Sequence, residues 1–275
     1  MQDPTTPITE RPVVLIVLKY GGNAMAAEGA PDPVLDEVAA LAARGDRVVL
    51  VHGGGPQIDA ELRAKAIDEP RVAGLRVTGR AARDVVEYVL CGAVNKALVR
   101  ALARRGARTV GISGEDGGLL VARRAGAIDG VDLGYVGEIE RVEPSAIRVL
   151  LDAGFVAVVA PLALDRTDGA ALNCNADTAA GAIAGALAAD AYVVITNVAG
   201  VRRDLADPSS VIPRLSADQA EAFLVDGTFS DGMIPKMAAA IRAVRGGARR
   251  AVVAGAGPGA ILAALAGQGT ELTGT

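Results

Sequence analysis

The hydrophobic and polar positions of this chain follow two patterns that alternate along its length. Short apolar runs end at glycine or another turn residue, and the longer segments between them carry apolar residues three or four positions apart. The first pattern is typical of buried strands and the second of amphipathic helices. Strands are predicted at 13–18, 47–51, 108–112, 155–160 and 191–196. Strands that alternate with helices in this way predict an open α/β sheet.

The predicted helices fill much of the chain between these strands. They are expected at 34–43, 57–66, 82–104, 144–153, 178–189, 217–225 and 235–245. The longest, 82–104, has an apolar stripe wide enough for the core or for a subunit interface. Residues 119–123 and 135–142 predict an antiparallel hairpin. The polar loop 165–171 divides one domain into lobes of residues 13–164 and 165–275, after a disordered lead at 1–12.

Composition limits the classes of protein to which the chain can belong. Of its 275 residues, 51% are hydrophobic and 22% are charged, so it can bury a large core. The net charge of -4, without a long basic run, argues against nucleic acid as a partner. Neither a signal-peptide pattern nor an apolar run long enough to span a membrane occurs, and Cys91 and Cys174 lack the spacing of zinc ligands. We expect a soluble cytoplasmic protein with reduced thiols.

Lysine is scarce in this chain, and one lysine follows the first strand. Only four of the 28 basic residues are lysines, namely Lys19, Lys65, Lys96 and Lys236. Lys19 stands at the carboxyl end of its strand, where ligands bind in α/β sheets, and Gly21 and Gly22 let backbone amides approach an anion. This arrangement suits a phosphate group. The alternative is an ordinary solvated lysine at the end of a strand.

A second glycine turn, His52-Gly53-Gly54-Gly55, joins the strand at 47–51 to a helix. Free amides at a helix N-terminus can hold a carboxylate or phosphate, and the alternative is a tight turn without a ligand. The motif also resembles the oxyanion loop of esterases. His52 is the only histidine, however, and Glu115 stands where a nucleophile elbow at 111–115 would need glycine. A hydrolase is therefore excluded.

Further polar candidates lie in both halves of the chain. Asn173 and Asn175 share one face of an extended segment, and Asp177 follows at the start of a helix, for which it could instead be the N-cap. Lys236 lies in the first turn of another helix. Arg76, in a short strand-like stretch, could bind a carboxylate through two hydrogen bonds or could be a surface residue.

The reaction can be narrowed by elimination. Residues 255–260 loosely match a dinucleotide fingerprint, but only 15 residues follow, too few for the βαβ unit that it requires, and no Walker A loop occurs. The remaining lysines, glycine amides, aspartate and asparagines suit phosphoryl transfer, in which positioning and charge neutralisation supply most of the catalysis. A carboxylate acceptor needs no base, because with a pKa of about 4 it is already ionised at pH 7. We therefore expect a kinase of a small carboxylate.

These motifs together resemble the amino acid kinase family, over about residues 13–270. The resemblance rests on Lys19–Met25 (KYGGNAM), His52–Ile58 (HGGGPQI), Gly74–Thr78 (GLRVT), Val94–Lys96 (VNK), Asn173–Asp177 (NCNAD) and Gly232–Lys236 (GMIPK). It is strongest for members that phosphorylate N-acetyl-L-glutamate in arginine biosynthesis. It implies a three-layer αβα sandwich around a mainly parallel sheet, with the acyl-amino-acid site in the N-terminal half and ATP in the C-terminal half.

The resemblance also implies a role for each candidate residue. Lys19 and Lys236 would stabilise the charge on the transferring phosphoryl group, and Asp177 would orient both lysines. The substrate N-acetyl-L-glutamate would contact Gly54, Gly55, Arg76, Asn173 and Asn175. The nucleotide ATP, with Mg²⁺ bound through its phosphates, would contact Gly21, Gly22, Asn197, Gly200, Ser230 and Met233. The sequence departs from the usual family residues at Asn197, Gly79 and 254–259, which concerns nucleotide contacts more than the chemistry.

An alternative substrate and the oligomeric state complete these expectations. Some family members phosphorylate aminoadipate or glutamate held on a carrier protein, and Cys91-Gly92 before Val94-Asn95-Lys96 is similar to them; Arg71, Arg80 and Arg83 could form the basic entrance that a carrier needs. An inactive binding protein is disfavoured because all three catalytic candidates are present. The short segment before the first strand predicts a homodimer, because arginine-inhibited hexameric relatives carry an extra N-terminal helix.

Overall fold

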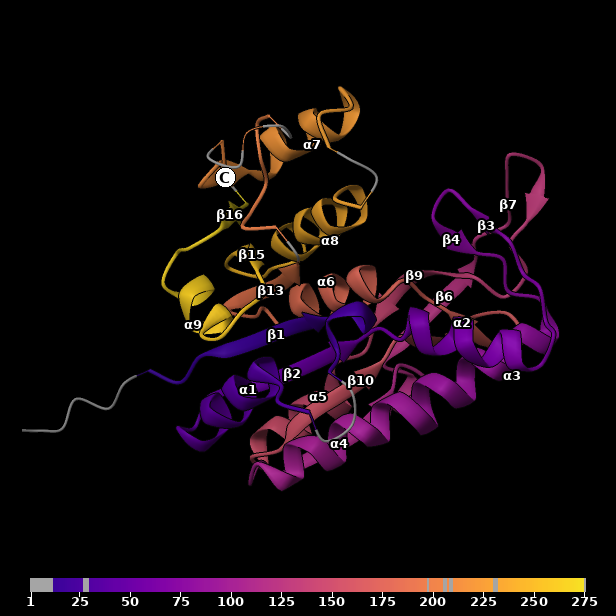
Figure 1. Cartoon of the computed structure of the whole chain (residues 1–275), viewed down its shortest axis with the longest axis horizontal. Coiled ribbons are helices and arrows are strands. Elements are labelled where there is room, and N and C mark those ends of the chain that lie inside the picture. Colours follow the sequence, from indigo (N-terminus) through magenta and orange to yellow (C-terminus); the bar gives the residue numbers. More distant parts are fainter. Residues whose placement is uncertain are drawn as a thin grey trace, which may run out of the picture.

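The centre of the fold is an eight-stranded sheet between layers of helices (Figure 1). The computed structural model describes residues 12–26, 30–196, 198–204, 207, 210–229 and 232–274. The strands follow the order β14 (Arg214–Ser216), β16 (Thr270–Thr273), β15 (Ala251–Gly255), β13 (Ala191–Thr196), β1 (Leu15–Tyr20), β2 (Arg47–His52), β10 (Val156–Ala160) and β5 (Thr109–Ser113). Neighbouring strands are parallel except β15 and β16. The five predicted strands and the mainly parallel sheet are confirmed.

Strand β1 lies where the two halves of the chain meet. We call residues 13–164 the first half of the chain and 165–275 the second half. On one side of β1 are β2, β10 and β5 from the first half, and on the other side are β13, β15, β16 and β14 from the second half. Tyr20 of β1 is opposite His52 of β2, and Lys19 is opposite Val194 of β13. Because parallel strands in register end at the same edge, the glycine turns that follow β1 and β2 lie side by side.

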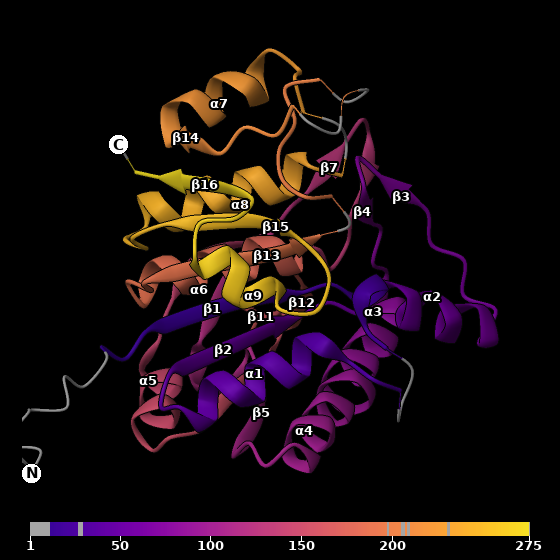
Figure 2. The same cartoon turned by 60° about the vertical axis from the view of Figure 1, so that its left-hand side comes forward.

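Two layers of helices cover the two faces of this sheet. One face packs against α1 (Pro33–Ala43), α4 (Asn95–Arg104) and α9 (Ala260–Leu265), and the other against α5 (Ser145–Asp152), α6 (Ala176–Ala186) and α8 (Ile234–Arg245), with α7 (Ala217–Val225) outside α8. Strand residues alternate between the two cores, so Leu18 faces the first core and Val17 the second. Figure 2 shows α1 and α9 in front of the sheet. The expected three-layer sandwich is confirmed.

A smaller sheet and two hairpins contribute the remaining strands. The sheet has the order β12 (Ala171–Asn173), β11 (Leu162–Asp165), β6 (Leu120–Arg124) and β9 (Gly137–Val142). The hairpins are β3–β4 (Arg71–Val72, Leu75–Arg76) and β7–β8 (Ala127–Ile128, Val131–Asp132). The predicted hairpin is confirmed as the antiparallel pair β6–β9. Strands β11 and β12 were not predicted, because they have only four and three residues and Pro161 directly precedes β11.

The segment at 82–104 differs from the single regular helix that was predicted. It consists of α3 (Arg80–Glu87), a π-helical stretch η2 (Tyr88–Val94) and α4. A π turn is wider than an α turn and is common at functional sites. The apolar spacing did not locate it, because the predicted stripe is wide enough to contain residues on both sides of one wider turn. It brings Leu90 against the glycine turn after β2.

The other short elements lie between these larger ones. They are α2 (Gly55–Ala64) and the 3-10 turns η1 (Gly22–Ala24) and η3 (Asp116–Gly118). Within the described ranges, no helix has the length and apolar character needed to cross a lipid bilayer. Apart from Pro12, the lead predicted at 1–12 lies outside the described residues.

Candidate active site

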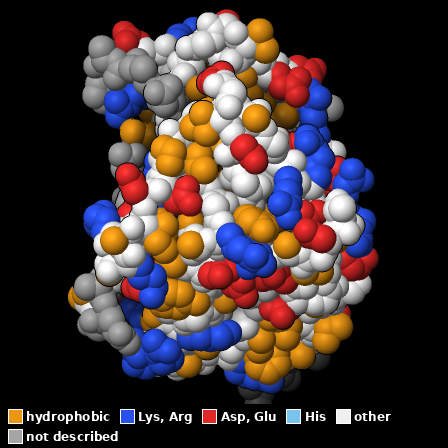
Figure 3. Space-filling view, turned by 90° about the vertical axis from the view of Figure 1, so that its right-hand side faces the viewer, with side chains coloured by type: hydrophobic (Ala, Val, Ile, Leu, Met, Phe, Trp, Pro, Cys, Tyr) orange, Lys and Arg blue, Asp and Glu red, His pale blue; other side chains and the backbone are white. Residues whose placement is uncertain are grey.

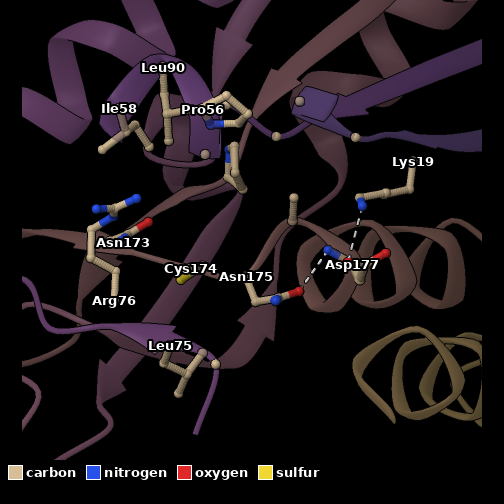
Figure 4. A pocket seen from close by; sticks show the side chains of 18 of the residues that line it. Lys19, Pro56, Ile58, Leu75, Arg76, Leu90, Asn173, Cys174, Asn175 and Asp177 are labelled. Carbon is tan, nitrogen blue, oxygen red and sulfur yellow. Dashed lines mark hydrogen bonds and ion pairs between the residues drawn. The ribbon is translucent and has the colours of Figure 1, made fainter. Parts of the chain in front are cut away.

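A cleft of about 740 Å³ opens at the carboxyl ends of the central strands. It lies between the glycine turns that follow β1 and β2 and the start of α6 (Figure 4). Most of the site residues predicted from the sequence line it, namely Lys19, Gly21, Gly22, Gly54, Gly55, Arg76, Asn173, Asn175, Asp177 and Lys236. These residues come from segments up to 217 positions apart in the chain, and the fold brings them together.

Two lysines and one aspartate form the charged centre of the cleft. Lys19 Nζ lies 3.2 Å from Asp177 Oδ2, and both side chains are almost fully buried. Lys236 Nζ donates a hydrogen bond to the Gly232 carbonyl at 2.7 Å. Burial lowers the pKa of Lys236, Asp177 opposes this shift, and Lys19 adds to it. Two cations therefore face one carboxylate, and the surplus positive charge suits an anionic ligand.

The start of α6 explains why Asp177 is available to the lysines. The Oδ1 atom of Asn175 accepts hydrogen bonds from the amides of Asp177 at 2.8 Å and Thr178 at 3.1 Å. Asn175 is therefore the N-cap, and the alternative that Asp177 caps this helix is wrong. Asp177 lies in the first turn with Oδ1 buried and without a hydrogen-bond partner among the described residues. Its carboxylate is directed to Lys19 in Figure 4.

The two glycine turns pack too closely for side chains. A Cβ atom on Gly22 would lie 3.2 Å from Gly54 Cα, and one on Gly53 would lie 3.4 Å from the Gly22 nitrogen. The first helical residue of α2 is Gly55, and its N-cap Gly54 offers no side-chain hydrogen bond. Backbone amides are thus the groups that these turns present, as expected for an anion site at a helix N-terminus.

The far end of the cleft carries polar groups with room for a small molecule. The Arg76 side chain is 7% exposed and forms an ion pair with Asp59, so it is not a free surface residue. Burial raises the pKa of Asp59, but hydrogen bonds and charges from Arg76 and Arg71 outweigh it and lower that pKa overall. Asn173 donates to Thr78 Oγ1 at 3.2 Å. Arg76 and Asn173 lie close together in Figure 4.

Some predicted nucleotide-binding residues lie elsewhere. Gly200 is buried, and a Cβ there would lie 2.8 Å from Val211 Cγ1; Met233 is the N-cap of α8 and packs against the apolar core. Neither lines the cleft. Asn197 and Ser230 lie outside the described residues. The nucleotide contacts assigned to these four residues stay predictions.

Sequence reasoning missed several residues that line the cleft. They include Asp59, Leu90, Thr196 and Ala256. Thr196 ends β13 and Ala256 follows β15, so their position after buried strands was a usable signal. Asp59 and Leu90 gave no such signal, because they lie inside helical segments and reach the cleft only through packing.

The two thiols and the single imidazole of the chain are not in the ionisation states that nucleophilic or base catalysis would need. Burial raises the pKa of both Cys91 and Cys174 to about 12, and neither thiol is in a disulfide. Burial lowers the pKa of His52 to about 4, so this side chain is neutral at pH 7. The cleft is therefore arranged for binding and charge stabilisation and not for thiol or histidine chemistry.

The glycine turn at 255–260 has a structural role. The amides of Ile261 and Leu262, in the first turn of α9, donate to Glu37 Oε2 at 2.9 and 3.0 Å. Glu37 belongs to α1 and is 8% exposed. An internal carboxylate thus occupies the place that a pyrophosphate takes in a dinucleotide fold. The exclusion of that fingerprint agrees with this geometry.

Comparison with known proteins identifies the family. Residues 14–255 match the model of the amino acid kinase family. The chain belongs to the amino acid kinase family. Within it, the chain is 47% identical over 247 residues to an acetylglutamate kinase of Acidiphilium cryptum, which covers 86% of the chain and 81% of that protein. It is 46% identical over 240 residues to an acetylglutamate kinase of Methanopyrus kandleri, and this match covers 86% of the chain and 93% of that protein.

Solved structures show the same fold. The structure of smu.665 from Streptococcus mutans is similar with a TM-score of 0.76 and 26% identity, covering 94% of the chain and 98% of that protein. The N-acetylglutamate synthase of Neisseria gonorrhoeae, in complex with coenzyme A and N-acetyl-glutamate, has a TM-score of 0.80 at 26% identity, covering 94% of the chain and 59% of that protein. The amino acid kinase fold thus accounts for almost the whole chain.

Proposed function

We propose that this protein phosphorylates the γ-carboxylate of N-acetyl-L-glutamate with ATP, forming N-acetyl-L-glutamyl 5-phosphate in arginine biosynthesis. The observation that carries the proposal is the identity of 46–47% with two acetylglutamate kinases over 86% of the chain. The protein is on this basis an acetylglutamate kinase of the amino acid kinase family. The cleft supports this function, because its lysines offer charge stabilisation, and a carboxylate acceptor, which is ionised at pH 7, needs no general base.

The proposed roles follow from the positions of the side chains. Lys19 and Lys236 would neutralise the charge that spreads over the transferring phosphoryl oxygens, and Asp177 would hold Lys19 in place. Amides of Gly21 and Gly22 would contact phosphate. The acyl amino acid would be held by Gly54, Gly55, Arg76, Asn173 and the free amide nitrogen of Asn175. The acceptor carboxylate then attacks without losing a proton, because it is already ionised.

The cleft suits magnesium that enters with the nucleotide. Asp177 Oδ1 is buried and has no described partner, and a carboxylate oxygen is the kind of ligand that Mg²⁺ prefers. Among the described residues, no three His, Cys, Asp or Glu side chains form a group able to hold a metal. ATP phosphates and water would therefore supply most of the Mg²⁺ ligands, and Asp177 Oδ1 is the protein atom that could add one more. When bound, Mg²⁺ would neutralise phosphate charge.

A carrier-bound substrate remains the alternative, and the surface gives it little support. Arg71 and Arg83, expected at a basic entrance, each pair with an aspartate, Asp59 and Asp84. Figure 3 shows Lys and Arg side chains interspersed with Asp and Glu on the face that carries the hairpins. A carrier protein with an acidic surface would gain little from such a mixed face.

We infer further that the protein is a cytoplasmic homodimer of single-domain subunits. Strand β5 ends the central sheet with an edge that is unpaired within the described chain, whereas the apolar stripe of 82–104 is buried in the core of the subunit itself. An open sheet edge is suited to a contact with a second copy. Light scattering should give twice the chain mass of 27.7 kDa, and a hexameric mass would contradict the inference.

The reaction can be tested by trapping its product. An acyl phosphate reacts with hydroxylamine to form a hydroxamate, so the purified protein is incubated with MgATP, hydroxylamine and free N-acetyl-L-glutamate. Glutamate and aminoadipate serve as control substrates. Hydroxamate formed with N-acetyl-L-glutamate alone is expected. If none of the free amino acids gives product, the assignment to N-acetyl-L-glutamate is wrong and a carrier-bound substrate takes its place.

A further inference from the structure

A buried polar network lies beneath the glycine turn that follows β2. His52 and Asn95 are 0% and 1% exposed. His52 Nδ1 lies 2.9 Å from the carbonyl oxygen of Gly53, and Asn95 Nδ2 lies 3.2 Å from His52 Nε2. Asn95 Nδ2 also reaches the carbonyl oxygens of Val158 at 3.0 Å and Ile112 at 3.2 Å. The network thus joins α4 to three strands of the central sheet.

The partners determine which nitrogen of His52 carries the hydrogen. A carbonyl oxygen can only accept, so Nδ1 must be the donor to Gly53. The Nε2 atom is then the acceptor for the Asn95 amide. Burial lowers the pKa of His52 to about 4, the bond to the Gly53 carbonyl opposes this, and the nearby Lys96 ammonium adds to it. His52 is therefore a neutral imidazole with a hydrogen on Nδ1.

The hydrogen bond to Gly53 controls the direction of the next amide. In a trans peptide the carbonyl and the following N–H point in opposite directions, and the described residues include no cis peptide. With the Gly53 carbonyl held toward His52, the N–H of Gly54 points away from the imidazole, and Gly54 lines the cleft. Among the residues that the structure describes, this amide has no protein acceptor.

Three consecutive glycines would otherwise leave this peptide poorly fixed. Glycine adopts positive and negative φ with similar ease, so a peptide plane between glycines can turn over at little steric cost. A reversed Gly53–Gly54 peptide would present its carbonyl oxygen to the cleft and repel an anion. On the other side of the turn, Leu90 packs so closely that a Cβ on Gly54 would lie 2.6 Å from Leu90 Cδ2. The turn is confined between Leu90 and His52.

We propose that His52, fixed by Asn95, is a positioning residue that holds the Gly53–Gly54 peptide with its amide directed at the anionic end of the acyl amino acid. The inference rests on the proposed function for the identity of that substrate. His52 does not touch the substrate in this arrangement. It acts through the backbone, and this explains why a buried neutral histidine is joined to strands and to α4 at once.

The first test observes the histidine itself. His52 is the only histidine of the chain, so a nitrogen-15 spectrum of untagged protein contains one imidazole. At pH 7 we expect a neutral ring with the hydrogen on Nδ1, as the geometry requires. A ring with the hydrogen on Nε2, or an imidazolium, would overturn the inference. This readout needs no substrate, so it remains decisive even if N-acetyl-L-glutamate proves to be the wrong substrate.

The second test separates the positioning role from packing with a matched pair of variants. In His52→Asn an amide nitrogen can take the place of Nδ1 and donate to Gly53, whereas in His52→Gln the amide can take the place of Nε2 and keep only the Asn95 contact. We expect His52→Gln to raise the KM for N-acetyl-L-glutamate about tenfold, the effect of one lost hydrogen bond. The KM for ATP should change less than about threefold. His52→Asn should restore most of the affinity.

The variant with the better affinity, His52→Asn, should be the less stable of the two, so the pair separates positioning from packing. His52→Asn leaves unfilled volume and loses the Asn95 contact, so it should unfold at lower urea than His52→Gln. A histidine that only packs would give KM values that follow stability. The inference is therefore wrong if both variants raise the KM equally, or if His52→Asn raises it more. Hydroxamate formation by the unaltered protein tests the proposed function separately.

Discussion

At the scale of single residues, the two lysines of the cleft differ in whether a carboxylate lies close to their ammonium group. Lys19 has a carboxylate partner at 3.2 Å, whereas the described hydrogen bond of Lys236 goes to the neutral carbonyl of Gly232. Within the described residues, the half-buried ammonium of Lys236 has no close counter-ion, and burial lowers its pKa. Such a group is poised for an anion that arrives with the substrates. We therefore propose that Lys236 stabilises the phosphoryl group in the transition state.

Replacement of Lys236 should separate turnover from binding. In Lys236→Ala we expect kcat to fall about 10²- to 10³-fold, the usual effect of removing one transition-state contact. The KM for N-acetyl-L-glutamate should stay within about threefold, because the contacts proposed for that substrate are with other residues. Lys65→Ala is the matched control, since Lys65 is an exposed lysine paired with Glu61 on α2. Equal losses in kcat and in N-acetyl-L-glutamate affinity would contradict the assignment.

The lowered pKa of Lys236 also predicts a pH dependence. In the proposed role Lys236 acts in its protonated form. Its pKa is below the ordinary value of 10.5, so this form is lost at a lower pH than in a solvated lysine. The kcat/KM for ATP, which reports the free enzyme, should therefore fall on the alkaline side with a midpoint below 10.5. In Lys236→Arg the guanidinium stays charged, so this limb should disappear even if the rate is lower. An unchanged limb would assign it to another group.

At the scale of elements, helix ends are used in two different ways. The N-termini of α2 and α6 face the cleft, and there the first turns carry glycine amides and Asp177. The N-terminus of α9 is instead closed by Glu37 of α1, whose other oxygen, Oε1, has no partner among the described residues. The same local signal, glycine before a helix, therefore leads to a ligand site or to an internal cap. At α9 the carboxylate of a neighbouring helix, that of Glu37, takes the place that stays open to the cleft at α2.

The cap on α9 should contribute measurably to stability. Glu37→Gln keeps the shape but removes the charge that faces two amides and the helix dipole, so we expect a loss of about 1–2 kcal/mol in the free energy of unfolding. Glu61→Gln is the control, because Glu61 forms an exposed pair with Lys65 and should cost under about 0.5 kcal/mol. Urea unfolding of both variants measures this. Similar small losses in the two variants would show that Glu37 does not act as a cap.

The elements were more predictable from the sequence than the contacts between them. Four of the five predicted strands were found because each holds a run of apolar residues buried on both faces of a parallel sheet, whereas 108–112 is mixed in composition and forms the half-buried edge strand β5. The helical periodicity could not show the π-helical segment, and β11 and β12 are too short to give a signal. Lys19 and Asp177 could be named as candidates from local motifs. Their 3.2 Å contact depends on β1 pairing with β13 and on Asn175 taking the cap, which no spacing reveals.

At the scale of the whole molecule, the cleft belongs to both halves of the chain. Its charged centre combines Lys19 from the first half with Asp177 and Lys236 from the second. The halves also share one sheet through β1, and β12 of the second half pairs with β11 of the first. The predicted boundary at 165–171 therefore joins two neighbouring strands of a single sheet. The predicted division into lobes therefore does not describe how the chain is held together.

This shared architecture predicts that the chain unfolds as one unit. Separation of residues 13–164 from 165–275 would break the β1–β13 and β11–β12 pairs and expose the core beneath α6, so neither lobe should melt alone. Calorimetry should show one transition. N-acetyl-L-glutamate at about 100 times its Kd should raise the free energy of unfolding by about 2.7 kcal/mol and so move the whole transition to a higher temperature. Two transitions, of which the ligand shifts only one, would instead show that the lobes are independent. In that case Lys19 and Asp177 would be held together by the substrates and not by the fold.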